Sequence, residues 1–244
     1  MPETVVVAER LCKRYGKREA VVDVSFKMLR GEVFGFLGPN GAGKTTTIRM
    51  LVGLIRPTAG RVFVAGRDLT REREAALRRM GCIVESPDFY EFLTGRENLE
   101  HFARMIDRAA LARIDEVAEL VRIRERLDDR LGTYSLGMRQ RLGIAQALLG
   151  APDVMVLDEP ANGLDPAGIR ELRLLLRRLA DDKGLAVFVS SHLLGEVERM
   201  CDRIAIVHRG RALAEGTLAE LTRDGTRSLE DVFLDVTGGQ TVGD

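Results

Sequence analysis

A glycine-rich segment is the part of the sequence best suited to chemistry, because its residue types and spacing can hold phosphate groups. It fits the pattern G-x-x-x-x-G-K-[ST] and consists of Gly38, Pro39, Asn40, Gly41, Ala42, Gly43, Lys44, Thr45 and Thr46. Glycines let backbone N–H groups approach phosphates closely, and the start of a following helix adds partial positive charge. Lys44 can reach the β- and γ-phosphates, and the Thr45 hydroxyl can bind Mg²⁺. The segment therefore predicts a nucleoside triphosphate with Mg²⁺ as the ligand.

Two carboxylates, Asp158 and Glu159, directly follow an apolar run at residues 154–157. Acidic side chains are unfavourable in a core, but the carboxyl end of a strand is where the sites of α/β proteins open. Asp158 can hold Mg²⁺ directly or through water, and Glu159 can polarise an attacking water. The competing interpretation is an acidic strand end that is merely solvated.

A third segment, residues 134–145, lies between these two and predicts a second place where anions can bind. Ser135 is suited to cap the helix that follows, and Gly137 leaves the first turn of that helix unobstructed. A helix start offers hydroxyl and N–H donors to an anion. Most helices capped by serine bind nothing, so this segment carries little weight alone.

Strands and helices must bring these distant segments together. Apolar or alternating runs predict strands at residues 5–8, 20–26, 33–37, 61–64, 81–84, 154–157, 185–189 and 203–207. The first two predict paired strands near a sheet edge, and the later, continuously apolar ones are typical of buried parallel strands. Helical patterns occupy residues 46–52, 73–80, 98–106 and 110–121, and another helix begins at Asp165-Pro166. The order predicts an α/β core interrupted by a helical insertion.

Composition favours an ordinary globular chain and gives no support for a nucleic-acid surface. The 244 residues contain 37 Lys plus Arg and 37 Asp plus Glu, so the formal net charge is zero. Cys12, Cys82 and Cys201 are far apart, which predicts reduced, buried thiols. The beginning of the chain lacks the pattern of a secretory signal, and no run approaches 18 apolar residues. We therefore expect no membrane span and a tail from Thr237 without fixed structure.

With these motifs in this order, the chain resembles the nucleotide-binding subunit of ATP-binding cassette (ABC) transporters, from about residue 5 to 236. The resemblance rests on the phosphate-binding segment, the Ser-x-Gly segment, Asp158-Glu159, Gly163-Leu164-Asp165 and Ser190-Ser191-His192. It implies a P-loop NTPase core with a mostly parallel sheet, an N-terminal antiparallel β subdomain and a helical insertion. It also implies one domain over 1–244, with the α/β core at about 1–85 and 150–215. The helical subdomain would span about 86–149, and C-terminal helices with a flexible tail about 216–244.

The resemblance further implies a dimer that holds two ATP, each between one subunit's phosphate loop and the other's Ser135 and Gly137. The dimer could be of identical subunits or of this chain with a second ABC subunit. Tyr15 takes the place of the aromatic that stacks on adenine, with an ordinary strand tyrosine as the alternative. His192 takes the place of the histidine that contacts the γ-phosphate. His101 and His208 show no metal-ligand pattern and are expected to be structural.

Two departures from the usual family pattern occur together. Residues 134–138 read Tyr-Ser-Leu-Gly-Met where the family usually has Leu-Ser-Gly-Gly-Gln, and Glu85 stands where the family has glutamine. Residues 85–99 resemble a subgroup linked to export of, and immunity to, peptide antibiotics such as bacitracin and lantibiotics. A glutamate beside Asp158 and Glu159 is tolerable only near a cation, so we expect Glu85 to join the Mg²⁺ shell when nucleotide binds. The alternative is a solvent-facing glutamate.

Together with these motifs, the resemblance implies an ATPase at the cytoplasmic face of the membrane that powers a separate integral membrane permease, for export of a drug or peptide antibiotic. Lys44, Glu159, His192 and Glu85 are the expected catalytic residues, and Thr45, Asp158 and Glu85 the expected metal ligands. One alternative is a soluble cassette ATPase acting on DNA or ribosomes, which the single cassette and neutral charge disfavour. Another is a regulatory nucleotide binder that does not hydrolyse, which Glu159 and His192 disfavour.

Overall fold

The phosphate-binding segment follows a central strand of a six-stranded sheet. The computed structural model describes residues 3–85 and 87–239, and in this part of the chain the sheet has the order β10-β9-β3-β8-β7-β6. Its strands are β3 (Val33–Leu37), β6 (Met80–Ile83), β7 (Val154–Leu157), β8 (Ala186–Ser191), β9 (Arg203–His208) and β10 (Arg211–Thr217). All neighbours pair in parallel except β9 and β10. The carboxyl ends of the parallel strands therefore meet at one edge, as the candidate chemistry requires.

A smaller antiparallel sheet covers one side of the first, as the N-terminal sequence predicts. Its order is β2-β1-β4-β5, and its strands are β1 (Thr4–Tyr15), β2 (Arg18–Leu29), β4 (Ala59–Val64) and β5 (Arg67–Asp68). Alternating side chains of β2 are buried, including Val24, Phe26 and Met28, because only one face of this sheet is covered. The rings of Phe26, Phe34 and Phe188 pack together between the two sheets.

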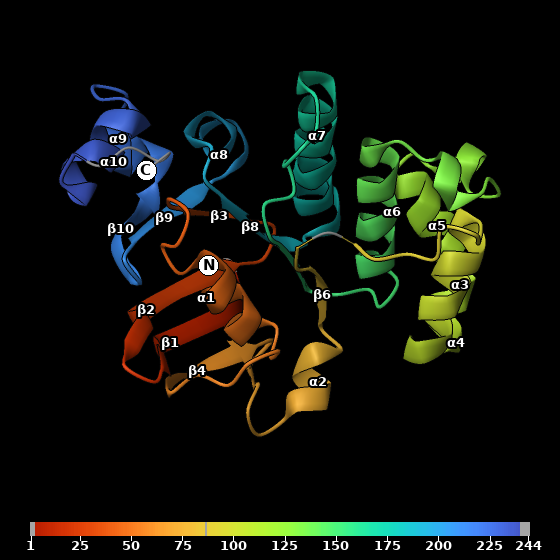
Figure 1. Ribbon diagram of the computed structural model, residues 1–244, viewed down its shortest axis with the longest axis horizontal. Coiled ribbons are helices and arrows are strands. Elements are labelled where there is room, and N and C mark those ends of the chain that lie inside the picture. The colour runs from red at the N-terminus through yellow and green to blue at the C-terminus, as the bar shows by residue number, and fades with distance from the viewer. Residues whose placement is uncertain (1–2, 86, 240–244) are drawn as a thin grey trace.

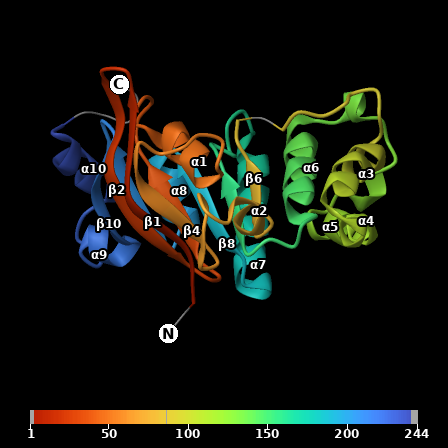
Figure 2. The same ribbon diagram turned by 90° about the horizontal axis from the view of Figure 1, so that it is seen from below.

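Helices between β6 and β7 gather to one side of the sheets, where Figure 1 and the turned view in Figure 2 both place them. These are α3 (Gly95–Ile106), α4 (Arg108–Ala112), α5 (Ile114–Leu120) and α6 (Leu136–Leu148). The remaining helices are α1 (Lys44–Leu51), α2 (Arg73–Leu77), α7 (Pro166–Lys183), α8 (Leu194–Met200), α9 (Leu218–Thr222) and α10 (Leu229–Thr237), with 3₁₀ turns at Arg124–Arg126 and Leu131–Thr133. None of the described helices is long and apolar enough to span a bilayer.

The six-stranded sheet separates two hydrophobic cores, so successive residues of its strands contribute to opposite sides. In β7, Met155 and Leu157 belong to the core that α6, α7 and α8 cover, whereas Val154 and Val156 belong to the core shared with α1 and the smaller sheet. β8 alternates in the same way. A strand covered on both faces reads as a continuous apolar run, which is why both strands could be predicted.

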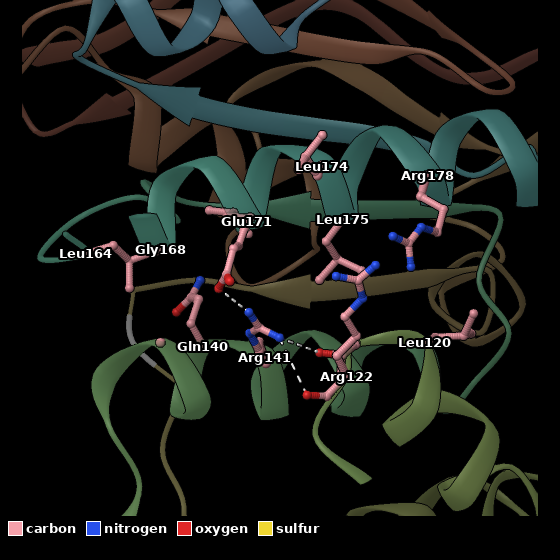
Figure 3. A pocket seen from close by; sticks show the side chains of 13 residues that line it. Leu120, Arg122, Gln140, Arg141, Leu164, Gly168, Glu171, Leu174, Leu175 and Arg178 are labelled. Atoms are coloured by element: carbon pink, nitrogen blue, oxygen red, sulfur yellow. Dashed lines mark hydrogen bonds and ion pairs between the residues drawn. The ribbon is translucent and has the colours of Figure 1, made fainter. Parts of the chain in front are cut away.

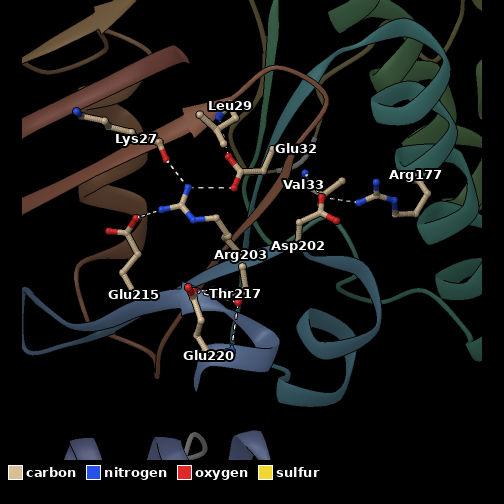
Figure 4. A network of polar contacts seen from close by, with 10 residues as sticks. All are labelled: Lys27, Leu29, Glu32, Val33, Arg177, Asp202, Arg203, Glu215, Thr217 and Glu220. Atoms are coloured by element: carbon tan, nitrogen blue, oxygen red, sulfur yellow. Dashed lines mark hydrogen bonds and ion pairs between the residues drawn. The ribbon is translucent and has the colours of Figure 1, made fainter. Parts of the chain in front are cut away.

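A network of polar contacts ties β9 to the turn before β3 and to β10 (Figure 4). The Arg203 guanidinium forms an ion pair with the buried Glu32 carboxylate at 3.0 Å and with Glu215, and it donates to the Lys27 carbonyl. Asp202 accepts from the Val33 backbone and pairs with Arg177 of α7. Since a buried charge is tolerated when it is paired, this network joins β3, β9 and α7 at the amino ends of the two strands, opposite the end that the phosphate-binding segment follows.

Three expectations about these regions need correction. The antiparallel strand β10 was not predicted, because alanines give its alternation little contrast in hydrophobicity. Cys82 is not buried: it lies on an exposed position of the edge strand β6, whereas Cys201 is buried and Cys12 is half-buried. Thr237 does not begin a tail but ends α10, where Gly238 adopts the left-handed conformation of a helix stop. The expected flexibility of residues 240–244 lies outside the described residues.

Candidate nucleotide-binding and hydrolysis site

The loop from Gly38 to Gly43 joins β3 to α1 and has the backbone shape expected of a phosphate cradle. A side chain at Gly38 would come within 2.3 Å of the Val207 carbonyl, so the loop packs against β9 at a distance that only glycine allows. Gly43 has a φ of 103° and precedes α1, whose N-terminus has no side-chain cap. The first amides of α1 are therefore available to an anion.

Lys44 lies at the mouth of this loop and is held there by the loop itself. Its side chain is 6% exposed, and Nζ donates to the carbonyls of Gly38 and Pro39 at 2.7 and 3.2 Å. Nζ also lies 3.1 Å from Oε1 of Glu159. The structure thus brings together a lysine and a glutamate that are far apart in the sequence.

Glu159 and its neighbours form a connected chain of polar contacts at the carboxyl end of β7. The other carboxylate oxygen of Glu159 lies 2.8 Å from Nδ1 of His192 and accepts from the His192 backbone N–H at 3.3 Å. His192 directly follows β8, and it lies beside Glu159 because β7 and β8 are adjacent parallel strands. Lys44, Glu159 and His192, all expected catalytic residues, therefore share one site.

Asp158 and Ser190 complete the strand end. The Ser190 hydroxyl donates to Oδ1 of Asp158 at 2.6 Å and accepts from the backbone N–H of Glu159 at 2.9 Å. Sequence reasoning did not assign a role to Ser190, although Ser190-Ser191-His192 was noted as a motif. Its position at the end of an apolar strand, beside the strand that ends in Asp158, was the available signal.

Glu85 lies apart from this chain of contacts. It follows β6 with a φ of 67°, its side chain is 65% exposed, and its carboxylate forms an ion pair with Arg49 of α1. The adjoining Ser86 lies outside the described residues. The geometry thus shows a different partner for Glu85 from the metal shell expected from the sequence.

Ser135 and Gly137 lie at the start of α6, the helix of the helical region that faces α7, and not beside the phosphate-binding loop. Ser135 caps α6 by accepting from the Met138 N–H at 3.3 Å, as predicted. Tyr134 before it is anchored by a hydrogen bond to the Arg126 carbonyl, and burial raises the pKa of Tyr134 to about 12. Ser135 and Gly137 line a pocket with Gly163 and Asp165, and Asp165 caps α7 as predicted. Figure 1 shows α6 and α1 in separate parts of the molecule.

Tyr15 ends β1 with its side chain 48% exposed, and Nζ of Lys13 lies 5.2 Å from the centre of its ring. An exposed ring beside a cation can accept a flat aromatic ligand on its free face. The tyrosine is therefore accessible, as a nucleobase contact requires.

The oxygen donors near the loop fit Mg²⁺ better than a softer metal. Asp158 supplies a carboxylate and Thr45 a hydroxyl, and Mg²⁺ prefers such hard ligands together with phosphate oxygens and water. In the described ranges no group of three or more His, Cys, Asp or Glu could hold a metal ion. A metal held by few protein groups and completed by a triphosphate agrees with this arrangement.

Comparison with known proteins gives one consistent result. The sequence model of the ABC transporter family matches residues 21–162. An ABC transporter ATP-binding protein of Bacillus subtilis (strain 168), YhcH, is 54% identical over 86% of this chain and 69% of its own length. The bacitracin transport ATP-binding protein BcrA of Bacillus licheniformis is 44% identical over 93% of this chain and 74% of its own. A solved ATP-binding subunit of an ABC transporter superposes with a TM-score of 0.83 at 32% identity, covering 95% of this chain and 99% of that one.

Proposed function

The chain belongs to the ATP-binding subunits of ABC transporters, and on that premise we propose that its hydrolysis of ATP powers the export of a peptide antibiotic through a separate membrane permease. Family membership establishes the ATPase. The observation that carries the mechanism is the contact of Glu159 with both Lys44 and His192. This contact supports the proposal, because a carboxylate suited to act as a general base lies with a cation and a second polar group at the mouth of the phosphate loop.

We propose the following roles at this site. ATP phosphates are held by the backbone of the loop Gly38–Thr46 and by α1, while Lys44 exchanges its carbonyl partners for the γ-phosphate. Thr45 and Asp158 would hold Mg²⁺, which neutralises charge on the phosphates when it is bound. Glu159 orients the attacking water, and His192 contacts the γ-phosphate. Tyr15 stacks on adenine.

We propose that the site is completed by a second subunit in a dimer around two ATP. Ser135 and Gly137 cap a helix start that can donate to a γ-phosphate, yet they line a pocket away from the loop of their own chain. Residues 86–149, which carry them, would act as a helical subdomain beside the α/β core. Two identical chains or a pair with another ABC subunit would both satisfy this arrangement.

Glu85 is proposed as the link between nucleotide and permease. Its carboxylate forms an ion pair with Arg49. When Mg²⁺ and ATP bind, it would leave Arg49 and join the metal shell, so that the adjoining loop to Tyr90 moves against the permease at the cytoplasmic face of the membrane. Pairing with Arg49 supplies a defined resting position for this movement.

The peptide-antibiotic cargo is proposed from the bacitracin relative and from the residue pattern at positions 85–99. The test is to produce the chain with the polytopic membrane protein encoded beside it in a sensitive bacterial host. Raised resistance to bacitracin or a lantibiotic supports the proposal. Resistance to a small-molecule drug alone would contradict it, and failure of the two proteins to co-purify would contradict the permease partner.

Hydrolysis is tested with Glu159→Gln. This change should lower the turnover number by about 100-fold or more while ATP affinity is retained, because the glutamate is needed mainly as water is activated. Glu198→Gln is the matched control, since Glu198 is exposed on α8. Turnover and binding of a fluorescent ATP analogue are the measurements. Hydrolysis at the wild-type rate would remove Glu159 from the catalytic role.

A further inference from the structure

Ser190 occupies a position where a hydroxyl group is unexpected. It is the fifth residue of β8, after an apolar run, and its side chain is 0% exposed. Val189 pairs in register with Leu157 on the adjacent strand, which places Ser190 directly beside Asp158 at the carboxyl end of the sheet. An apolar residue would suit a fully buried strand position, so the hydroxyl must be satisfied by its neighbours.

Its two hydrogen bonds have fixed directions. The backbone N–H of Glu159 can only donate, so Ser190 Oγ accepts this bond at 2.9 Å. The single hydroxyl proton is then available for Oδ1 of Asp158 at 2.6 Å, and an ionised carboxylate can only accept. One hydroxyl group therefore connects the two acidic residues of the site.

The hydrogen bond from Ser190 to Asp158 controls the direction of the Asp158 carboxylate. With Oδ1 held by a hydroxyl, the carboxylate cannot rotate freely, and Oδ2 is left for a cation. Partners of this kind orient metal ligands and strengthen metal binding, and their loss commonly weakens it by about 10- to 100-fold. The fit of Asp158 to Mg²⁺ thus depends on a residue that does not itself reach the metal.

The hydrogen bond that Ser190 accepts from the Glu159 N–H supports an uncommon backbone conformation. Glu159 has a φ of 48°, in the left-handed region that side chains other than glycine seldom occupy. Such conformations persist where surrounding contacts determine them. By accepting from the Glu159 N–H, Ser190 holds the turn that directs the Glu159 carboxylate toward Lys44 and His192.

We propose that Ser190 is a positioning residue of the ATPase site, which fixes the metal-binding direction of Asp158 and the water-activating direction of Glu159 through one hydroxyl. The inference rests on the proposed roles of these two acids. It goes beyond them by predicting that metal affinity and turnover depend on the same buried serine. A serine that only satisfies buried polar groups would affect stability and neither of these properties.

The test compares Ser190→Ala, Ser190→Cys and Ser190→Thr in the full chain. Mn²⁺ binding is measured by electron paramagnetic resonance in the presence of a non-hydrolysable ATP analogue, nucleotide affinity is measured in EDTA, and the turnover number is measured with Mg²⁺. Ser190→Ala should weaken Mn²⁺ binding by about 10-fold or more and lower turnover by about 10-fold or more. Nucleotide affinity in EDTA should stay within about twofold, because the phosphate loop is intact. Ser190→Thr, which keeps the hydroxyl, should recover most of both losses.

Thr222→Val is the matched control, because it removes another buried hydroxyl, one that donates to the Leu218 carbonyl in α9. It should leave metal affinity and turnover unchanged. Wild-type Mn²⁺ affinity and turnover in Ser190→Ala would overturn the proposal. If that variant does not fold, as judged by circular dichroism, Ser190→Cys decides, and unchanged values there overturn it equally. A wild-type chain that bound the analogue but hydrolysed no ATP would instead contradict the proposed function.

Discussion

At the scale of residues, the Glu159 carboxylate is the group that links the other polar groups of the site. It accepts contacts from an ammonium group, an imidazole nitrogen and a backbone N–H. The Lys44 ammonium is thus paired with the carboxylate proposed to activate water. A γ-phosphate would compete for Lys44, so on that proposal binding of ATP would release Glu159 from the ion pair.

Glu85→Gln tests the one expected site residue that the structure places with another partner. If Glu85 joins the metal shell, this change should raise the Mg²⁺ concentration for half-maximal hydrolysis by about threefold, a small part of the effect of losing a full ligand. It should also impair transport more than ATP binding. ATPase rate against Mg²⁺ concentration and transport with the permease are measured in parallel. Values equal to wild type in both assays would show that Glu85 contributes neither to the metal shell nor to transport.

Arg49→Gln is the control for this experiment, because it removes the ion-pair partner of Glu85. Both side chains of this pair are largely exposed, so the pair contributes little to stability. If Glu85 serves only that pair, the two variants should behave alike. A Mg²⁺ dependence that changes in Glu85→Gln alone supports the metal role.

Much of the site could be predicted because its residues follow local patterns. The spacing of Gly38, Gly43, Lys44 and Thr45, and the position of Asp158-Glu159 after an apolar run, can be read within a few residues. The contact of Lys44 with Glu159 depends on strand order, which no local pattern contains. The role of Ser190 was not predicted for the same reason, since it depends on the contact with Asp158 on the neighbouring strand.

At the scale of elements, α6 and α7 are joined by a bridge from the helical region to the core. The Arg141 side chain reaches Glu171 of α7 and donates to the carbonyls of Val121 and Arg122 at the end of α5, as Figure 3 shows. Arg141 and Glu171 line a pocket together with Gly137, the second residue of α6. Three helices from two parts of the chain thus depend on one guanidinium group.

Arg141→Met should therefore destabilise the protein by about 1–2 kcal/mol, because the carbonyls lose donors as well as the ion pair. Glu171→Gln should cost less than about 0.5 kcal/mol, since Glu171 is exposed and its charge is screened. Urea denaturation of both variants and of the double variant gives the two effects and their coupling. Equal losses in the two single variants would show that the ion pair, and not the carbonyl contacts, holds the helices.

Most elements were predictable because their residues repeat with the period of the structure. β3 and β7 were predicted over the same residues that they occupy, since both faces are covered and the runs are continuously apolar. The residues at which helices and strands begin and end were harder to predict. α3 begins at Gly95, where Thr94 and Glu97 form a reciprocal cap, although the apolar pattern indicated a start at Asn98. β10 was missed because alanines give its alternation little contrast.

At the scale of the whole molecule, the phosphate loop precedes α1 and Ser135 caps α6, and these two helices lie in separate parts of the molecule (Figure 1). If each nucleotide needs both, a lone subunit should be nearly inactive. ATPase activity per subunit should therefore rise with protein concentration, by about 10-fold across the dimer's dissociation constant, because the second contact acts on the transition state. Steady-state rates over a dilution series are the measurement. Constant specific activity well below the dissociation constant would show a self-contained site.

Ser135→Arg sharpens this experiment, because it places a bulky charge at the proposed contact with the partner's ATP. Ser228→Arg is the matched control: Ser228 caps α10 as Ser135 caps α6, so both variants lose a helix cap worth about 1 kcal/mol. Nucleotide binding by the monomer should survive in both. Only Ser135→Arg should abolish the rise of activity with concentration, and loss of that rise in both would point to stability instead.

The division of the central sheet between two cores also limits how the length of this chain can change. Removing one residue from β7 would exchange Met155 and Leu157 with Val154 and Val156, so each core would receive side chains shaped for the other. The same deletion would turn Asp158 away from Ser190. Insertions and deletions should consequently be poorly tolerated in the strands that end at the site, which can change only by substitution.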